Sequence, residues 1–321
     1  MQYSLSVSSS PHIRSRSNTS KIMLDVVIAL LPATAMAIYY FRMNALFIIL
    51  STVISCVLAE FIWTRIVKRP NTIKDFSAVV TGLLLALNLS PRVPIWIAVL
   101  GGAFAIIIVK QLFGGLAGNI VNPALAARAF MVASWPSQMT IWVSPGVDAT
   151  TVATPLGIIK DAGTASLPQL PPLWDMFIGN IGGSLGETSA LALILGGVYL
   201  LIRKVISPAI PVAFIGTTAF FTWLVGGETL FAGNFLVHIL AGGLMIGAIF
   251  MATDYATSPT NLKGRIIFGI GCGFLTAMIR IYGGYPEGVS WAILLMNLTV
   301  PLIEKATIPV SFGGGRKRKN A

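Results

Sequence analysis

Long apolar stretches, separated by short polar segments, run through almost the whole chain. A helix needs about 20 residues to cross the roughly 30 Å hydrocarbon core of a bilayer. Ten stretches reach or approach that length, at 22–41, 45–66, 76–90, 94–113, 123–135, 174–202, 209–225, 235–252, 264–282 and 289–304. The pattern therefore predicts an all-α polytopic membrane protein with ten transmembrane helices.

Three of these stretches differ from ordinary spans. The stretch 123–135 is short, whereas 76–90 and the part of 174–202 that follows Thr188 are rich in small residues. Short or glycine-interrupted segments in corresponding places are typical of broken helices that line a binding site. Because five stretches lie on each side of a long central connection, the two halves must have opposite topology. We expect two inverted groups of five helices, some of them broken or short.

The same pattern divides the chain into five parts. They are a cytoplasmic N-terminal segment (1–21), a first five-helix half (22–135), an extracytoplasmic loop (136–173), a second five-helix half (174–305) and a basic cytoplasmic tail (306–321). The central loop has about 35 residues, many of them Pro, Gly, Ser or Thr, and loops of that length usually have a function. We therefore expect chemistry in this loop.

Composition and charge support the membrane assignment. Only 10% of the residues are charged, against about 25% in soluble domains. This excludes a soluble globule, a disordered chain and a secreted disulfide scaffold. The net charge of +11 is compatible with nucleic-acid binding, but an N-terminus in the cytoplasm places 17 of the 22 Lys and Arg residues on the cytoplasmic side. The basic residues therefore set the orientation, with both termini in the cytoplasm and no nucleic-acid partner.

The two cysteines do not predict a metal centre. Cys56 and Cys272 each lie within an apolar stretch and are more than 200 residues apart. An iron–sulfur cluster normally needs four protein ligands, which one pair of thiols cannot supply. We expect buried, inert thiols and no metal site.

The most specific local string lies in the central loop, with the order Asp148-Ala149-Thr150-Thr151-Val152-Ala153-Thr154-Pro155. A proline disfavours the helical conformation of the residue before it, so Thr154 is expected to be extended. Its hydroxyl can then project from a fixed backbone. A Thr- and Pro-rich loop without any function is the alternative.

This string resembles the motif Asp-x-x-(Ser/Thr)-Gly-Ala-Thr, at which a flavin transferase attaches FMN to the last threonine through a phosphoester bond. Asp148, Thr151, Ala153 and Thr154 match the motif, and Val152 stands where glycine is usual. In a ten-span protein, the motif resembles the family of the D subunit of the Rnf ion-translocating ferredoxin:NAD oxidoreductase. The homologous B subunit of the sodium-translocating NADH:quinone oxidoreductase shares it. The resemblance implies covalent FMN on Thr154, on the extracytoplasmic side.

Further strings extend the resemblance over almost the whole chain. They lie at 10–12, 75–78, 110–115, 122–124, 186–190 and 252–259. The N-terminal segment is shorter than in the quinone-reductase homologue, which favours the Rnf family. The resemblance implies an electron-carrier subunit of a redox-driven sodium- or proton-translocating complex in the bacterial inner membrane. It also implies non-covalent riboflavin, whose pocket no residue identifies.

The implied partners are the other membrane and peripheral subunits, together with a flavin transferase for maturation. The chain has no glycine-rich nucleotide turn after a strand, so we expect NAD and ferredoxin to bind other subunits. The chain is then inactive alone and holds no catalytic residue of its own. Trp135 and Trp142 are candidates for stacking on the flavin, although aromatic residues of this kind also belong to the membrane interface.

Acidic residues at membrane depth form a second set of candidates, because ionisable groups are costly there. We expect Asp25, Glu187 and Asp254 to contact an ion or a flavin. Capping of a helix N-terminus is the alternative for Glu187 and for Asp75. The oxygen atoms around Asp254 suit a sodium ion or a flavin ring edge equally well. Arg128, in the short stretch 123–135, is expected to pair with an acid or to meet a flavin.

A secondary transporter or channel with no redox role is the alternative function. Broken helices, inverted halves and intramembrane acids are expected there too. Since a fold alone does not determine function, only the flavin motif and the family strings favour the redox subunit.

Overall fold

The computed structural model describes residues 18–70, 72–146, 151–162, 170–187, 189–227 and 229–309. In these ranges the regular structure is helical, apart from one isolated antiparallel β-bridge between Val143 and Thr151. Asp148, the first residue of the flavin motif, lies outside the described residues.

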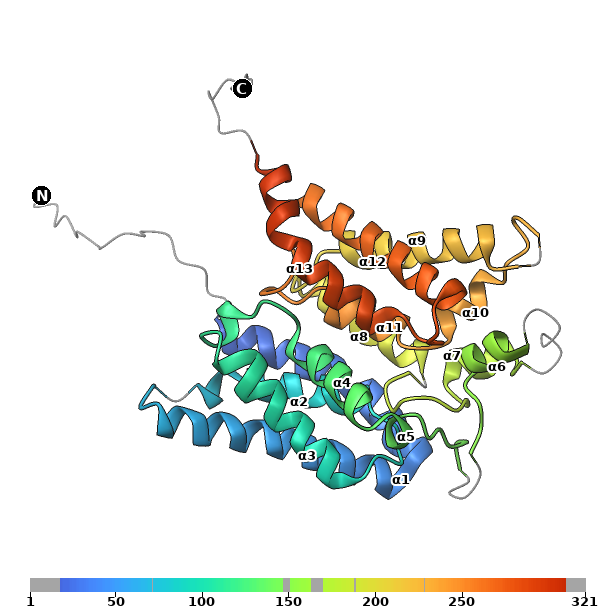
Figure 1. Cartoon of the computed structure of the whole chain (residues 1–321). Helices are drawn as coiled ribbons and strands as arrows, with labels where there is room; N and C mark the ends of the chain where they lie inside the picture. The colour runs from blue at the N-terminus through green and yellow to red at the C-terminus, as the bar shows by residue number, and fades with distance from the viewer. Residues whose placement is uncertain are drawn as a thin grey trace, which may run out of the picture.

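The first half begins with a helical hairpin. Helix α1 (Thr19–Ile66) is interrupted at Arg42, whose backbone angles of φ 49° and ψ −132° are not helical. Figure 1 shows the two arms of α1 side by side, and they correspond to the predicted stretches 22–41 and 45–66. The remaining elements of this half are η1 (Ile73–Asp75), α2 (Ser77–Leu87), α3 (Ile95–Phe104), η2 (Ala105–Gln111), η3 (Leu116–Gly118), α4 (Pro123–Ser134) and α5 (Pro136–Met139).

Helices α2 and α4 of this half are too short to cross a bilayer. Helix α2 has 11 residues and α4 has 12, which correspond to only about 17 Å at the helical rise per residue. Helix α2 ends at Leu87, and α4 begins after Asn122, whose side-chain oxygen accepts the backbone N–H of Ala124 at 3.0 Å. The stretch 123–135, which is short in the sequence, forms α4, and the stretch 76–90, which is rich in small residues, contains the short helix α2.

The second half contains further interruptions. Its elements, with the short helix before it, are α6 (Pro155–Ala162), α7 (Leu173–Ile178), α8 (Ala190–Ile202), α9 (Ala209–Val225), α10 (Phe235–Leu240), α11 (Leu244–Ile246), η5 (Gly247–Met251), α12 (Leu262–Tyr282) and α13 (Val289–Thr307). The stretch 235–252 breaks at Gly242, which has a φ of 72°. Glycine adopts this angle without the steric cost that a Cβ would impose. The stretch 174–202 breaks between α7 and α8.

The non-helical segments of one half are hydrogen-bonded to the other half. The backbone N–H groups of Leu185 and Gly186 donate to the carbonyls of Leu89 (2.9 Å) and Leu87 (2.6 Å). In the same way, the Asn122 side chain donates to the Met251 carbonyl at 3.2 Å. Hydrocarbon offers no partners to backbone polar groups, so breaks at membrane depth require such bonds.

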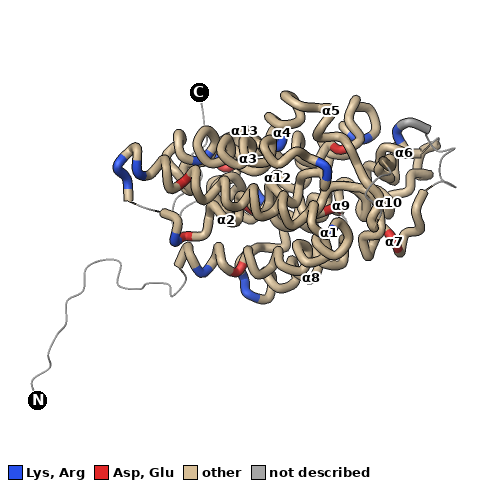
Figure 2. The backbone as a smooth tube through the Cα atoms, turned by 90° about the horizontal axis from the view of Figure 1, so that it is seen from below, with Lys and Arg blue, Asp and Glu red and all other residues tan. Residues whose placement is uncertain are grey.

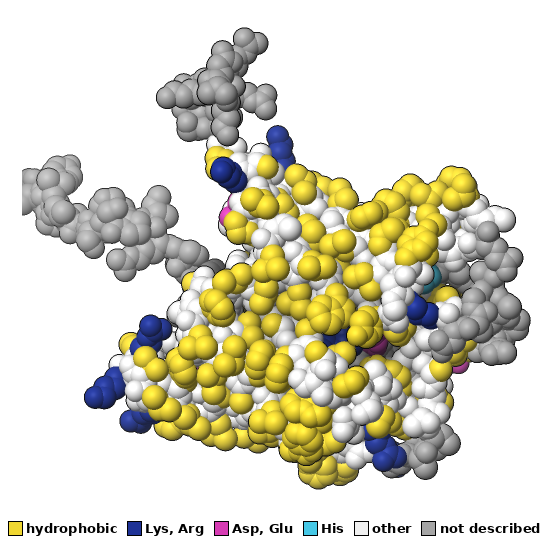
Figure 3. Space-filling model, in the orientation of Figure 1, with side chains coloured by type: hydrophobic (Ala, Val, Ile, Leu, Met, Phe, Trp, Pro, Cys, Tyr) yellow, Lys and Arg dark blue, Asp and Glu magenta, His cyan; other side chains and the backbone are white. Residues whose placement is uncertain are grey.

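The surface of the bundle is suited to lipid. Figure 3 shows hydrophobic side chains over most of one face, and Figure 2 shows few charged positions along the length of the helices. Among the described residues, α1, α12 and α13 are long and apolar enough to cross a membrane. The chain is therefore a helical membrane protein, and the count of ten crossings stays a prediction.

The two ends of the helix bundle are formed by different elements. Helix α1 begins and α13 ends at one end, whereas α5, α6 and α7 lie at the opposite end (Figure 1). Helix α6, which directly follows Thr154, thus lies at the end of the bundle opposite to the start of α1 and the end of α13.

Candidate functional site

Thr154 lies directly before α6 and is buried, with 7% of its surface exposed. Its hydroxyl oxygen accepts a hydrogen bond from the Gly157 backbone N–H at 3.1 Å. A Cβ atom at position 157 would lie 3.2 Å from that oxygen, so glycine keeps this side of the hydroxyl open. Thr154 therefore caps the N-terminus of α6, where the helix dipole favours a negatively charged group.

The segment before Thr154 is held by backbone pairing. The Val152 N–H donates to the Trp142 carbonyl at 3.0 Å, next to the β-bridge between Val143 and Thr151. A Cβ atom at position 182 would lie 2.5 Å from the Val152 side chain. Glycine at 182 therefore makes room for valine at the position where the flavin motif usually has glycine.

Helix α6 is fixed against the second half of the chain. Leu156 packs in a small apolar cluster with Met176, Ile181 and Val237. The Lys160 ammonium donates to backbone carbonyls in the connection between α12 and α13. The position of Thr154 is thus set by contacts that come from several elements.

A cavity of about 630 Å³ adjoins the same segment. Trp142, whose carbonyl binds Val152, forms part of its wall. The side chains that line it are those of Asn88, Arg128, Ala129, Val132, Met139, Thr140, Trp142, Tyr285, Pro286, Glu287, Ser290 and Trp291. Trp135 instead packs edge-to-face on Trp96, with ring centroids 5.3 Å apart. Of the two tryptophans considered from the sequence, only Trp142 faces this cavity.

Buried charges lie at the inner wall of the cavity. Arg128 forms an ion pair with Glu287, and its guanidinium also donates to the Ser290 hydroxyl at 2.6 Å. The predicted pairing of Arg128 with an acid is confirmed. Glu187 is 4% exposed and accepts the Ser184 N–H at 3.3 Å. It does not cap α8, because Ser189 accepts the N–H of Ala192 there.

A second cavity, of about 670 Å³, lies towards the end of the bundle where α1 begins. Its polar lining consists of Ser77, Thr81, Asn119, Asn122, Thr253, Asp254 and Tyr255. The buried side-chain oxygen of Asn119 has no hydrogen-bond partner in the described part of the chain. Such an atom is costly unless a ligand or water binds it.

Asp254 lies in the connection between η5 and α12, at the edge of this second cavity. Burial raises the pKa of its carboxyl, and the hydrogen bond from the Thr257 hydroxyl (3.1 Å) opposes that rise. The structure thus brings Asp254 together with Asn119 and Asn122, and it keeps Thr154 apart from them.

Asp25 and Asp75 have protein partners. Asp25 accepts the Tyr199 hydroxyl at 2.8 Å and pairs with Arg203 at 3.3 Å, which joins α1 to α8. Asp75 accepts the backbone N–H of Ser77 at 2.8 Å, at the start of α2. Asp75 thus binds the first N–H of α2, although the N-cap position itself is occupied by Phe76.

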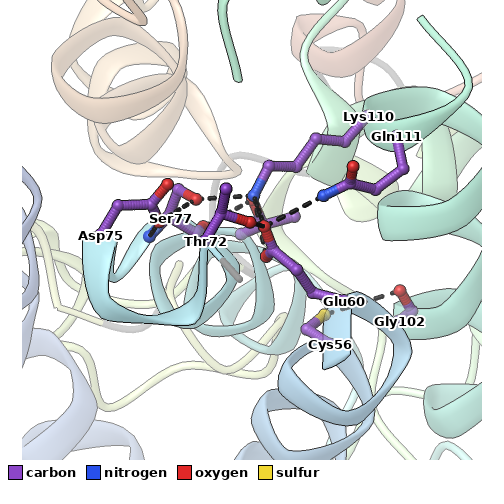
Figure 4. A network of polar contacts seen from close by, with 9 residues as sticks. Cys56, Glu60, Thr72, Asp75, Ser77, Gly102, Lys110 and Gln111 are labelled. Atoms are coloured by element: carbon purple, nitrogen blue, oxygen red, sulfur yellow. Dashed lines mark hydrogen bonds and ion pairs between the residues drawn. The ribbon is translucent and has the colours of Figure 1, made fainter. Parts of the chain in front are cut away.

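A buried ion pair joins α1 to η2 in the first half of the chain. The sequence places Lys110 among the cytoplasmic basic residues, but its side chain is 1% exposed and lies 2.9 Å from Glu60. Figure 4 shows further donors around this carboxylate, and Gln111 and Thr72 both donate to it. The Lys110 ammonium also donates to the Ser77 hydroxyl at 2.6 Å. Each oxygen of Glu60 thus has a charged partner.

Two features escape sequence reasoning. Glu287 lies in a Pro-Glu-Gly string between two apolar stretches, which is also the pattern of an ordinary loop. The partner of Lys110 is 50 residues away in sequence, and no local pattern shows it. Both cysteines are buried and free, as predicted.

The match of the chain to known proteins agrees with this arrangement. A family model described as the NQR2, RnfD, RnfE family matches residues 6–313. The chain belongs to this family.

Similar proteins of this family cover nearly the full length. The chain is 50% identical to the D subunit of the Na(+)-translocating ferredoxin:NAD(+) oxidoreductase complex of Acetobacterium woodii, over 100% of this chain and 99% of that protein. It is 47% identical to the D subunit of the proton-translocating ferredoxin:NAD(+) oxidoreductase complex of Clostridium ljungdahlii, over 97% and 96%. It is 37% identical to the D subunit of the ion-translocating oxidoreductase complex of Escherichia coli, over 96% and 98%.

Proposed function

We propose that the chain is the D subunit of an Rnf-type ion-translocating ferredoxin:NAD oxidoreductase and carries FMN on Thr154. The observation that supports this most directly is the geometry of Thr154, whose hydroxyl lies at the N-terminus of α6 with Gly157 beside it. Pro155 has no N–H and the Ile158 N–H donates to the Thr154 carbonyl, so a phosphoester formed there would meet the N–H groups of Leu156 and Gly157. The family and the full-length relatives support the same assignment.

The cavity beside Trp142 supports a place for the isoalloxazine ring. Trp142, Tyr285 and Trp291 supply aromatic walls, and the unpartnered Nε of Arg128 supplies a hydrogen-bond donor. Bound FMN accepts and releases electrons singly or in pairs. The protein fixes the cofactor covalently and orients it, so that transfer needs no diffusive binding step.

We assign the non-covalent riboflavin to the second cavity. Apolar side chains such as Leu84 and Phe250 line it together with the amides of Asn119 and Asn122. The unpartnered oxygen of Asn119 suits a ring N–H donor. Asp254 then contacts either this flavin or the transported ion.

The complex would sit in the bacterial inner membrane, with ten spans in this subunit and both of its termini in the cytoplasm. Ferredoxin and NAD would bind peripheral subunits, and a flavin transferase would modify Thr154 from the outer side. The transported ion is sodium or a proton. Two relatives differ in the ion that their names give, so the family alone does not choose between them.

The first test is Thr154→Val, with the wild type as reference, each coexpressed with a flavin transferase. Denaturing gels remove loosely held flavin, so ultraviolet fluorescence of the band reports a covalent bond. We expect a bright wild-type band and a dark variant band. Thr307→Val is the matched control and should stay bright, because Thr307 lies outside the motif, at the end of α13, where its hydroxyl donates to its own helix.

A dark wild-type band would contradict the FMN assignment and favour the transporter or channel without a redox role. A bright Thr154→Val band would move the attachment site to another hydroxyl in the loop. Asn119→Leu tests the second cavity separately: the acid-extractable flavin should fall at least tenfold while the gel band stays bright. Unchanged extractable flavin would place riboflavin elsewhere.

A further inference from the structure

An apolar groove lies between α8 and α9 in the second half of the chain. It has a volume of about 760 Å³, and every residue that lines it is apolar or glycine. Met245 and Ile249 are buried and form its floor, whereas Val212 on its rim is 69% exposed. A groove of this kind on a membrane protein suits a hydrocarbon chain.

The groove has free space beside α9. Gly216 lines it, and a Cβ atom added at this position would meet no atom within 4 Å. On the opposite wall, a Cβ atom at position 197 of α8 would lie 2.9 Å from the Ile249 side chain. Helix α8 is therefore close to the floor, whereas a bulky side chain at position 216 can fill the groove without displacing protein atoms.

A basic pocket adjoins the groove where α8 ends and α9 begins. It has a volume of about 590 Å³, and Ile206 lines both the pocket and the groove. Lys204 and Arg265 contribute two cations to the pocket, and Ser207 and Ser258 contribute hydroxyl groups. A polar, positively charged space is thus continuous with an apolar one.

The two cations of the basic pocket have no acidic partner. Among the described residues, neither Lys204 nor Arg265 takes part in an ion pair, and no acidic residue lines the pocket. The Arg265 Nε donates to the Pro259 carbonyl at 3.1 Å, which orients the guanidinium and leaves its other N–H groups free. Ammonium and guanidinium groups bind phosphate strongly. The pocket therefore fits a phosphate group.

The basic pocket lies at the end of the bundle where α1 begins and α13 ends. Arg203, next to Lys204, pairs with Asp25 of α1 at 3.3 Å. Asn261, directly before α12, donates to the carbonyl of Thr307 at the end of α13 at 3.3 Å. We predict that this end faces the cytoplasm, so the pocket would lie at the depth of the inner-leaflet headgroups.

We propose that the groove and the basic pocket together bind one anionic phospholipid. Its phosphate contacts Lys204 and Arg265, and one acyl chain lies along α8 and α9. The groove follows α8 from Leu201 to Ile194, which is about 10 Å at the helical rise and holds the first part of an acyl chain. Basic pockets between helices on the cytoplasmic side are typical sites for anionic headgroups.

Other occupants would fill only one of the two spaces. A helix of another subunit would cover the groove but leave both cations without a partner. A free phosphate would bind the cations but leave the groove empty. A phospholipid fills both, because its charged phosphate is joined to its hydrocarbon chains.

The proposed lipid borders the second cavity. Val205, Ile206, Thr253 and Tyr255 line both that cavity and the basic pocket. A headgroup in the basic pocket would therefore lie against the wall of the second cavity. The lipid site goes beyond the proposed function and does not depend on either flavin being bound.

The test is photo-crosslinking of the purified complex with phosphatidylglycerol that carries a photoreactive diazirine in one acyl chain. Mass spectrometry of peptides then locates the label. We expect label on the residues of α8 and α9 that line the groove. Excess unlabelled phosphatidylglycerol should remove this label, whereas phosphatidylcholine and inorganic phosphate should not.

Variants test the two parts of the site separately. Gly216→Phe fills the groove and should lower the groove label at least tenfold. Lys204→Gln combined with Arg265→Gln should also lower it at least tenfold, because each basic residue near an anionic lipid contributes about fivefold in affinity. Lys263→Gln is the matched control, since Lys263 is exposed and does not line the pocket. Arg265→Lys keeps the charge and should retain most of the label.

Three results would overturn the proposal. Equal competition by phosphatidylcholine would identify an ordinary surrounding lipid, competition by inorganic phosphate would identify a site for soluble anions, and an unlabelled groove in the wild-type complex would mean that another subunit covers it. Unchanged label in the double variant would likewise exclude the basic pocket as the headgroup site. The midpoint of thermal unfolding checks that each variant is folded. Because the label does not require flavin, failure of the FMN assignment would leave the result readable.

Discussion

The two buried acids Glu60 and Glu187 differ in their donors. Both are almost fully buried, but Glu60 accepts from Lys110, Gln111 and Thr72, whereas Glu187 accepts from a single backbone N–H among the described residues. A buried carboxyl with a full set of donors holds the elements that supply those donors together. One with few donors is suited to gain and lose a proton. Burial alone therefore does not distinguish a structural acid from a functional one.

The Lys110–Glu60 pair gives a prediction at this scale. Lys110→Met leaves Glu60 charged and unpaired in the interior, which should destabilise the protein by about 3–5 kcal/mol. Thermal unfolding in detergent measures the loss. Glu60→Gln combined with Lys110→Met should recover most of it, because no unpaired charge remains. Lys263→Met, at an exposed position, is the control; an equal effect of both single variants would contradict the structural role of the pair.

At the scale of the elements, close helix contacts depend on glycine. Helices α9 and α12 meet where a Cβ at position 273 would lie 2.7 Å from the Phe214 carbonyl oxygen. A Cβ at position 269 would lie 2.9 Å from the Ile210 carbonyl oxygen. Glycines spaced four residues apart are typical of close helix contacts in membranes. The sequence pattern Gly-x-x-x-Gly at 269–273 therefore has its expected packing role.

We expect Gly273→Leu to separate α9 from α12 and to lower stability by about 1–3 kcal/mol or more. The measurement is the midpoint of thermal unfolding of the purified protein, together with the yield of assembled complex. Gly216→Ala in α9 is the matched control, because a Cβ there meets no atom within 4 Å. A comparable loss in the control would show that helix glycines act through backbone freedom and not through close contact.

Hydropathy predicts most elements and little of their interior chemistry. Apolar runs set the arms of α1 and the helices α9, α12 and α13 correctly, since lipid contact requires a continuous apolar surface. Hydropathy does not predict the break at Gly242, because the break lies within an apolar run and depends on a backbone angle. It does not predict the pairing of Arg128 with Glu287 either, since this pairing joins residues 159 positions apart.

At the scale of the whole molecule, the helix ends give a topology that can be tested. Helix α1 begins and α13 ends at one end, and α5 to α7 lie at the other (Figure 1). This arrangement agrees with the excess of Lys and Arg near the termini. The broken helices of one half are hydrogen-bonded to the other half, so residues of both halves form the interior of the molecule.

A reporter that is active only in the cytoplasm, fused after Ala321, should therefore be active. The same reporter inserted after Ser137, next to α5, should be inactive, and a periplasmic reporter should show the opposite pattern. Activity of one reporter at both positions would contradict the opposite placement of the tail and the central loop. Correct assembly of the fusions is checked by the covalent flavin band.

The π-helical winding of η2 has a consequence for the direction of its side chains. Each residue of an α-helix turns the chain by about 100°, and a π turn holds one surplus residue. Rewinding η2 as an α-helix would rotate Lys110 by about that angle away from Glu60. The π-helical segment η5 likewise sets the direction of the side chains of Thr253 and Asp254, which follow it. In each half, therefore, the extra residue of a π turn determines the direction in which a polar side chain points from its helix.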